Sequence, residues 1–164
     1  MQMTHLRNAT LVFLIKKSEG KITEICLAMK KRGFGMGKWN GVGGKVEQGE
    51  TIEESARREA KEEIGISPNN MEKTAEISFY WPNNPAWDQM VHIYFSDNWT
   101  GEPVESEEMN PLWFKVSEIP FDKMWADDIL WLPRALENKL LRATFKFGDG
   151  AIVLEQEINI VDKL

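Results

Sequence analysis

The amino-acid sequence predicts an α+β fold in which a mixed β-sheet lies between helices, an α/β/α layering. Two observations favour this class. Segments with the composition of β-strands recur along the chain, and most are joined in pairs by short turns. One strongly marked helical segment, residues 51–63, interrupts them. The 164 residues contain no internal repeat, low-complexity tract or long linker, so residues 1–164 are expected to form one domain that acts as a monomer.

The expected strands are short apolar segments bounded by turn residues. Two of them flank residues 18–20 and are expected to form a hairpin, and the last two flank the turn at residues 148–150 in the same way. The predicted strands cover residues 10–16, 24–29, 75–81, 90–95, 112–116, 143–147 and 151–158.

Clear signals mark both ends of the helix expected over residues 51–63. Thr51 and Glu54 have the spacing of a capping box, and Gly65 followed by Pro68 is typical of a helix end. A second helix is expected near residues 128–140, where Pro133 must lie in the first turn or kink the helix.

Charge is distributed unevenly along the chain. There are 26 Asp and Glu against 20 Lys and Arg, a net charge of −6. Residues 1–46 carry nine basic side chains and two acidic ones, whereas residues 47–63 carry seven acidic and three basic, and residues 101–128 eight acidic and two basic. General nucleic-acid-binding proteins have the opposite overall balance, which excludes a nucleic-acid polymer as the main partner. The basic front is instead suited to attract a small anion.

The single cysteine, Cys26, excludes an intramolecular disulfide and a Cys-x-x-Cys metal site. It lies in an apolar run, so a buried structural thiol is expected. The longest apolar stretch near the N-terminus, residues 9–15, is too short to span a membrane and lacks a signal-peptide pattern, and no membrane partner is expected. The predicted location is a reducing compartment, the cytoplasm, with nuclear or mitochondrial pools as alternatives in a eukaryote.

A glycine-dense segment precedes the first helix, and it does not fit two common nucleotide-binding motifs. A P-loop needs Ser or Thr after Gly-Lys, but Lys45 is followed by Val46. No Gly-x-Gly-x-x-Gly pattern can be placed on the glycines, so a Rossmann fingerprint is also lacking. The glycines lie at positions 33, 35, 37, 41, 43 and 44.

Three carboxylates of the first helix are spaced so that they share one face. Glu59, Glu62 and Glu63 stand at positions i, i+3 and i+4, and their like charges repel unless a cation lies among them. Carboxylate oxygens suit a hard divalent cation such as Mg²⁺, with Mn²⁺ as an alternative. The competing interpretation is a solvated acidic face. His5 and His92 lack the spacing of metal ligands and are expected to be structural or surface residues.

The spacing of these residues decides between the two interpretations. Gly44 is followed after five residues by Glu50, and after seven more by Arg58-Glu59-Ala60-Lys61-Glu62-Glu63-Ile64-Gly65-Ile66. The segment resembles the Nudix box, G-x5-E-x7-R-E-U-x-E-E-x-G-U with U aliphatic, and matches it at every fixed position over 23 residues. Its one weak position is the first U, which is the small residue Ala60. The resemblance implies a divalent-metal hydrolase of a nucleoside diphosphate linked to another group.

The resemblance also implies roles for single residues. Glu59 and Glu63 are the candidates for the catalytic base. Arg58 is expected to pair with Glu50 or to orient a catalytic glutamate, and a plain ion pair within the helix is the alternative. The expected metal ligands are the backbone of Gly43 and the carboxylates of Glu59, Glu62, Glu63 and Glu108.

The likeness extends beyond the Nudix box. Residues 29–46, 103–109, 119–121 and 124–128 are similar to the oxidised purine nucleoside triphosphate hydrolases of animals. This implies cleavage of 8-oxo-dGTP and 2-hydroxy-dATP to the monophosphate and pyrophosphate, which sanitises the nucleotide pool. Trp125 would stack on the purine, and Asp127 and Asp128 would meet its Watson–Crick edge. The expected substrate-binding residues are Thr10, Lys30, Phe34, Asn40, Gly43, Gly44, Lys45, Phe79, Trp125, Asp127 and Asp128.

Several alternatives stay open at this point. The substrate of a Nudix enzyme can instead be a methylated purine triphosphate, ADP-ribose or a dinucleoside polyphosphate, and a Nudix module can bind a nucleotide without hydrolysing it. Asp127 and Asp128 also suit a plain helix N-terminus. Lys30, Lys31 and Arg32 fit a solvated turn or a phosphate-attracting rim. Ala126 stands where animal relatives carry proline, and the Trp- and Pro-rich residues 81–87 are expected to reshape the mouth of the pocket.

Overall fold

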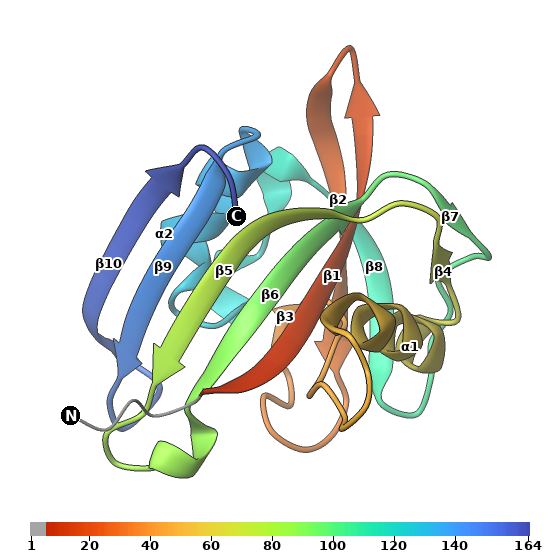
Figure 1. The fold of residues 1–164 in the computed structure, drawn as a ribbon. Helices are drawn as coiled ribbons and strands as arrows, with labels where there is room; N and C mark the ends of the chain where they lie inside the picture. Colours follow the sequence, from red (N-terminus) through yellow and green to blue (C-terminus); the bar gives the residue numbers. More distant parts are fainter. Residues whose placement is uncertain (1–5) are drawn as a thin grey trace.

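The computed structural model describes residues 6–164, and His5 lies outside this range. A mixed sheet of eight strands dominates the fold, in the order β10-β9-β5-β6-β1-β2-β3, with β8 paired to the free side of β2 (Figure 1). The strands of this sheet are β1 (Arg7–Ser18), β2 (Lys21–Lys30), β3 (Trp39–Asn40), β5 (Glu72–Tyr80), β6 (Gln89–Ser96), β8 (Met109–Lys115), β9 (Leu140–Phe147) and β10 (Val153–Val161). The remaining elements are helices α1 (Ile52–Ile64) and α2 (Asp128–Leu136), the 3₁₀ turns η1 (Pro85–Trp87), η2 (Val116–Glu118) and η3 (Phe121–Lys123), and the short pair β4 (Ser67–Pro68) and β7 (Trp99–Thr100).

The predicted hairpins and the mixed character of the sheet are confirmed. β1 and β2 pair antiparallel across a turn in which Glu19 and Gly20 both have positive φ, as the tightest hairpin turns require. β5 pairs with β6 and β9 with β10, also antiparallel. The sheet is mixed because β1 runs parallel to β6, and β5 parallel to β9.

β1 is buried on both faces, and this explains its nearly continuous apolar sequence. Phe13 and Ile15 point into the larger core, where Trp131 and Leu132 of α2 pack against the sheet. Residues of the opposite face pack against α1 in a second core. The two helices therefore lie on opposite faces of the sheet, as the predicted layering requires, with α1 in front of it and α2 behind it in Figure 1. The second core contains Val12, Leu14, Tyr94, Ala56, Ala60 and Ile64.

Both ends of α1 follow the predicted signals. The Thr51 hydroxyl accepts a hydrogen bond of 3.1 Å from the backbone N–H of Glu54, which satisfies one of the free donors of the first turn. Gly65 ends the helix in the left-handed conformation at φ 73°, and its N–H donates to the Lys61 carbonyl. These two signals set the bounds of the helix that carries Glu59, Glu62 and Glu63.

The second helix is shorter than the predicted range of residues 128–140. α2 ends at Leu136, because Asn138 adopts a left-handed conformation at φ 64° and its N–H caps the helix on the Ala135 carbonyl. Pro133 lies beyond the first turn, where it has no N–H to donate to the Ile129 carbonyl. The strand predicted at residues 112–116 begins earlier, at Met109, because an edge strand tolerates Pro111.

Helices of the described residues are all too short or too polar to cross a lipid bilayer.

Replacement of Thr51 by Ala is expected to lower the free energy of unfolding by about 1 kcal/mol, because the first turn of α1 loses its capping oxygen. Thr51→Ser keeps an oxygen within reach of the Glu54 N–H and should retain most of the stability. Urea unfolding followed by circular dichroism measures both variants. An unfolding curve of Thr51→Ala that overlays the wild type would show that the cap contributes nothing.

Candidate functional site

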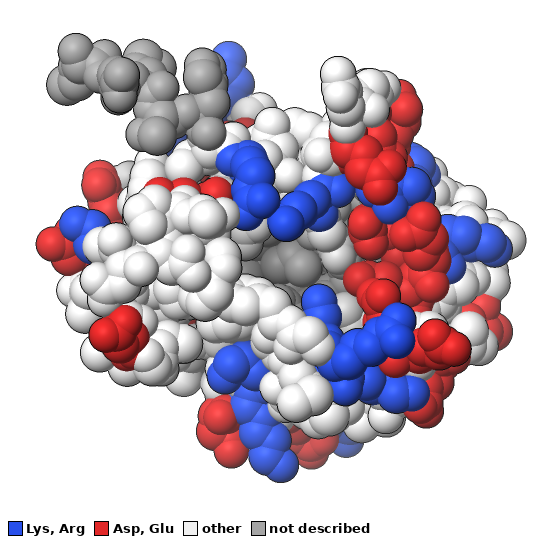
Figure 2. Space-filling model, turned by 90° about the horizontal axis from the view of Figure 1, so that it is seen from below, with Lys and Arg blue, Asp and Glu red and all other residues white. Residues whose placement is uncertain are grey.

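A cavity of about 300 Å³ opens beside the end of the sheet where β5 stops and β1 and β6 begin. Strands β1, β2, β6 and β9 contribute to its walls, together with the loops at residues 31–38, 41–45 and 125–128. Figure 2 shows basic side chains bordering a hollow on this lower face, with acidic side chains gathered to one side. The basic residues that line the cavity are Lys30, Lys38 and Lys45.

All eleven residues predicted to bind substrate line this cavity. They come from sequence positions as distant as Thr10 and Asp128, and the fold brings them together. Other lining residues had no local signal in the sequence. Gln89 and Phe147 belong to this group, since they reach the cavity only through the pairing of β5 with β6 and β9. Trp81 also lines the cavity, and it belongs to the Trp- and Pro-rich segment that was expected to reshape the pocket mouth. Lys38 belongs to the basic segment of residues 1–46, but no sequence motif identified it as a cavity residue.

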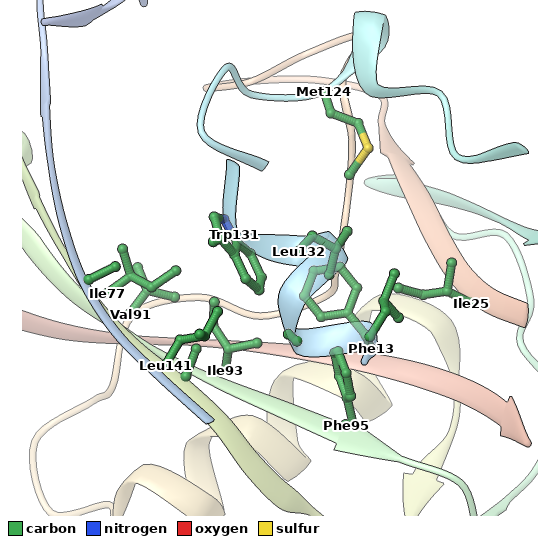
Figure 3. Close-up of a cluster of buried hydrophobic side chains, with 14 of the residues drawn as sticks. Phe13, Ile25, Ile77, Val91, Ile93, Phe95, Met124, Trp131, Leu132 and Leu141 are labelled. Carbon is green, nitrogen blue, oxygen red and sulfur yellow. The ribbon is translucent and has the colours of Figure 1, made fainter. Parts of the chain in front are cut away.

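The floor of the cavity is part of the hydrophobic core. Val91, Ile93 and Trp131 line the cavity and also belong to the larger core cluster, in which Figure 3 shows Trp131 beside Val91 and Ile93. A ligand in this cavity therefore contacts side chains that are held by the packing of the sheet against α2. Such a floor is rigid, because core side chains have few alternative positions.

Two adjacent carboxylates lie at the inner end of the cavity. Asp127 and Asp128 are each 3% exposed. Asp127 Oδ2 accepts a hydrogen bond of 2.8 Å from the indole N–H of Trp131, whereas Asp128 Oδ2 has no partner among residues 6–164. Burial raises the pKa of Asp127 to about 6, and burial beside Asp127 raises the pKa of Asp128 well above its usual range.

The interpretation of these aspartates as a plain helix cap does not describe the geometry. Asp127 occupies the N-cap position of α2, but its side chain makes no capping hydrogen bond. A solvated cap is exposed, and both side chains are buried and directed at the cavity. A buried carboxyl without a partner is costly unless it is protonated or meets a ligand, so the pair is chemically suited to recognise a polar edge.

Arg58 organises the acidic face of α1. Its guanidinium donates to Glu50 at 2.8 and 2.9 Å, to Glu59 at 3.0 Å and to Glu62 at 3.1 Å. Both predicted roles of Arg58 therefore occur together, the pair with Glu50 and the ion pair within the helix. The hydrogen bonds from Arg58 lower the pKa of Glu50 to about 2.

Glu63 joins α1 to the glycine loop. Its Oε2 accepts a hydrogen bond of 2.9 Å from the Gly43 N–H, and the side chain is buried. Burial, followed by the nearby charge of Glu59, raises the pKa of Glu63 to about 8. The two glycines are needed for this approach. A Cβ on Gly43 would lie 1.7 Å from the Thr10 carbonyl oxygen, and a Cβ on Gly44 would lie 2.7 Å from Glu59 Oε1.

Glu108 lies outside α1, in the loop before β8, where Arg32 donates to it at 3.4 Å. Lys31 forms an ion pair of 2.6 Å with Glu105 of the same loop. Of the three basic residues at 30–32, two are thus paired with acids, and Lys30 alone lines the cavity. Lys31 and Arg32 therefore have a structural role, whereas Lys30 forms part of the rim of the cavity.

The predicted metal ligands do not converge on one point in this structure. Within residues 6–164, no three His, Cys, Asp or Glu side chains are arranged around a common centre. The donor set still fits a divalent cation, because Glu59 and Glu108 are close enough to raise the pKa of the buried Glu63 by charge repulsion. Carboxylate oxygens that repel one another are the ligands a hard divalent ion prefers.

Comparison with known proteins agrees with this arrangement. A sequence model described as the NUDIX domain matches residues 5–135 of the chain. The chain belongs to the Nudix family. The Nudix box predicted from the spacing of the glutamates is thereby confirmed, and so is the predicted fold class. Nudix hydrolases in general use a divalent metal.

Two relatives are similar over most of the chain. An "Oxidized purine nucleoside triphosphate hydrolase" of Danio rerio is 48% identical over 140 residues, which cover 85% of this chain and 89% of the relative. A protein of the same name from Mus musculus is 43% identical over 160 residues, or 98% and 99% of the two chains. A crystal structure of a mutator MutT protein from Bacillus halodurans has a TM-score of 0.80 at 26% identity and covers 94% of this chain and 98% of that one.

Gly43→Ala is expected to lower the free energy of unfolding by about 1–3 kcal/mol, because the added Cβ overlaps backbone that must move. Gly44→Ala is the matched control, since its Cβ meets only the end of the Glu59 side chain, which can rotate away. Its stability should stay near that of the wild type. Urea unfolding of the three proteins tests the contrast, and equal losses in both variants would contradict it.

Asp128→Asn is expected to make the protein more stable at pH 8. Because the folded-state pKa of the buried pair is raised above the usual value near 3.8, the folded protein holds more protons than the unfolded chain above that value, and stability falls as pH rises. Removal of one acid should therefore raise the free energy of unfolding at pH 8 by about 1 kcal/mol or more, since one pKa unit corresponds to about 1.4 kcal/mol.

The gain from Asp128→Asn should shrink towards pH 4, where the wild-type pair is protonated. Urea unfolding at pH 4, 6 and 8 measures it, with Asp162→Asn at an exposed position as the matched control. A gain that grows towards low pH would show that the carboxyl is held charged in the folded protein.

Proposed function

We propose that this Nudix protein hydrolyses oxidised purine nucleoside triphosphates, with 8-oxo-dGTP and 2-hydroxy-dATP as substrates and Mg²⁺ as the metal. The products are the nucleoside monophosphate and pyrophosphate, and the reaction sanitises the nucleotide pool. The observation that carries the proposal is the buried pair Asp127 and Asp128 at the inner end of an aromatic cavity. The names of the two similar animal relatives support the same substrate class.

The aspartate pair suits the edge of a modified purine. If the two carboxyls share one proton, one oxygen can accept from ring N–H and amino groups while the protonated oxygen donates. The raised pKa of both groups supports a shared proton near neutral pH. One pocket can thus meet the different donor and acceptor patterns of 8-oxoguanine and 2-hydroxyadenine. Trp125 supplies an aromatic face beside this edge for the base to stack on.

The lysines of the cavity suit the triphosphate. No ion pair among residues 6–164 engages Lys30, Lys38 or Lys45, so their charge is free to attract an anion. Lys38 Nζ lies 5.2 Å from the centre of the Trp125 ring, next to the proposed stacking face. Asn40 and Thr10 line the same cavity.

Hydrolysis needs a proton acceptor near the phosphates. We assign this role to Glu63, with Glu59 as the second candidate, because a buried carboxylate with a pKa near neutral can take and release a proton. In the reaction the oxygen of water bonds to phosphorus, the bond from phosphorus to the leaving oxygen breaks, and the proton of water moves to Glu63 Oε. The displaced group leaves as pyrophosphate. Arg58 holds Glu59 in place through the 3.0 Å hydrogen bond.

The proposed ligands of Mg²⁺ are Glu59, Glu62, Glu63 and Glu108, together with the backbone carbonyl of Gly43. When bound, the ion neutralises phosphate charge, polarises the attacked phosphorus and lowers the pKa of water. Of Glu59, Glu62 and Glu63, Glu62 is the most exposed, at 58% exposure of its side chain, and it can exchange its contact with Arg58 for the ion.

Residues 1–164 are proposed to act as one domain and as a monomer. β9 and β10 follow the segment that the NUDIX sequence model matches, yet they complete the same sheet, and β9 supplies Phe147 to the cavity. All walls of the cavity come from one chain. A reducing compartment such as the cytoplasm suits the thiol of Cys26, which is buried as predicted and whose pKa burial raises to about 12.

The proposal is tested by incubating the protein and Mg²⁺ with 8-oxo-dGTP, 2-hydroxy-dATP, O6-methyl-dGTP, dGTP and ADP-ribose. Product analysis should find monophosphate plus pyrophosphate from the oxidised purines, at a kcat/KM about tenfold or more above that of dGTP. Asp127→Asn and Asp128→Asn should change the ratio of these values more than the rate at saturation. Equal rates on dGTP and 8-oxo-dGTP would contradict the proposed role.

Glu63→Gln is the control for the chemical step, because glutamine keeps an oxygen that can accept from the Gly43 N–H. It should remove turnover of every substrate and leave the circular dichroism spectrum unchanged. Full activity of this variant would exclude Glu63 as the base.

A further inference from the structure

Five aromatic side chains from four segments pack together beside the cavity, and we call this group the collar. Trp81 also contacts Phe34 and Trp125 across it, at 6.2 and 6.0 Å. Neighbouring ring centres along the collar are 4.7 to 6.2 Å apart. Four of the five line the cavity, whereas Trp87 stands outside the lining. In order around the collar the residues are Phe147, Trp81, Trp87, Phe34 and Trp125.

Phe34 is the most weakly held member of the collar. Its side chain is 52% exposed, and it lies between Gly33 and Gly35, which have φ of 79° and 83°. Gly37 follows with φ 85°, so the loop of residues 31–38 contains three left-handed glycines. Such a loop has many alternative conformations to lose when it is ordered. Backbone hydrogen bonds from the Gly37 N–H to the Lys30 carbonyl and from the Lys38 N–H to the Gly35 carbonyl hold the loop itself. The rings that Phe34 contacts hold its side chain over the cavity.

Trp87 is held by a much firmer loop, at residues 81–88. The Trp81 N–H donates to Asp88 Oδ1 at 2.7 Å, which closes the base of the loop. Asn83 donates to Asp149 at 2.9 Å, and the Arg7 guanidinium donates to the Ala86 carbonyl. Pro82 and Pro85 restrict the backbone further. Both loops leave the lower end of the molecule in Figure 1, and they meet where Trp87 contacts Phe34.

We infer that Trp87 is a positioning residue that props Phe34 across the mouth of the cavity and so sets the affinity of the site for a nucleobase. Its ring lies 5.0 Å from Phe34 and 5.3 Å from Trp81, and Phe34 in turn lies 5.1 Å from Trp125. Without the Trp87 ring, Phe34 keeps only its contacts with Trp125 at 5.1 Å and Trp81 at 6.2 Å, and we expect the base end of the cavity to open to water. The inference rests on the proposed function, because it takes the nucleobase to lie at the aromatic end of the cavity.

Trp87 touches none of the carboxylates of α1 and none of the cavity lysines in the hydrogen bonds, ion pairs or ring contacts of residues 6–164. Its effect should therefore fall on binding and not on the chemical step. Because it acts through Phe34, its effect should also vanish when Phe34 is absent, since residues that share one contact do not contribute additively.

Limited trypsin digestion tests directly whether Trp87 holds Phe34 in place, and it needs no ligand. The pliable loop contains Lys31, Arg32 and Lys38, so its opening exposes sites that trypsin cleaves. Trp87→Ala should be cut in this loop roughly 2- to 10-fold faster than the wild type, in line with the loss of one aromatic pair. Trp87→Phe should restore most of the protection. Trp99→Ala is the matched control, because Trp99 stacks on Trp113 at 5.6 Å, away from the cavity.

Binding tests the consequence for the site. The dissociation constants of 8-oxo-dGMP and dGMP are measured by calorimetry without metal, so that the readout does not depend on hydrolysis. Trp87→Ala should bind 8-oxo-dGMP roughly 2- to 10-fold more weakly, with kcat for the triphosphate close to that of the wild type. Trp87→Phe and Trp99→Ala should bind as the wild type does. Phe34→Ala/Trp87→Ala should bind no more weakly than Phe34→Ala alone.

Two results would overturn the inference. The first is unchanged binding and unchanged trypsin cleavage in a folded Trp87→Ala, and the second is equal weakening by Trp87→Ala and Trp99→Ala, which would indicate a general loss of stability. If Trp87→Ala does not fold, Trp87→Leu is judged by the same criteria. Equal wild-type hydrolysis of dGTP and 8-oxo-dGTP would contradict the proposed substrate alone, because the trypsin result is independent of it.

Discussion

The arrangement of the site depends on the close contact of three backbone segments at Gly43. On one side, the glycine segment bonds to β1, where the Thr10 N–H donates to the Gly44 carbonyl and the Val42 N–H donates to the Val12 carbonyl. On the other side, the Gly43 N–H donates to Glu63 of α1. No side chain fits between Gly43 and β1, because a Cβ there would overlap the Thr10 backbone, so the glycine segment lies directly against the strand while the Glu63 side chain reaches it from α1. The spacing of the Nudix box is thus a packing constraint as well as a chemical one.

Because many charged side chains are paired with one another, the net charge of the protein is a poor guide to the charge of its ligand. Arg58 offsets three acids of the box and its neighbourhood, and Lys31 and Arg32 offset acids of the loop before β8. The lysines that line the cavity take part in none of the ion pairs of residues 6–164, and the buried Glu63 lies near one of them, Lys30. An overall acidic protein therefore presents a basic rim next to an acidic face, and a phosphate chain with a divalent ion can meet both.

Sequence reasoning was most accurate where the information is local. α1 could be predicted from Thr51 to Gly65 because its caps and its face are encoded within one segment, and the residues of the cavity were predicted through a family resemblance that extends over most of the chain. Phe147 could not be found in this way, since it meets Trp81 only because β5 runs parallel to β9. The end of α2 was wrong because Asn138 adopts a conformation that its residue type permits but does not require.

The parallel pairing of β1 with β6 has a consequence for the order in which this protein matures. Thr10 lies beside His92, and the cavity is completed only when Phe147 arrives on β9. Contacts between residues so distant along the chain form late and slowly, because a large loop must close before they stabilise anything. When the whole Nudix box has left the ribosome, the nucleotide site of the nascent chain is therefore still incomplete. Because Phe147 of β9 lines the cavity, a partly synthesised chain that ends before β9 contains the glutamates of α1 without the complete cavity.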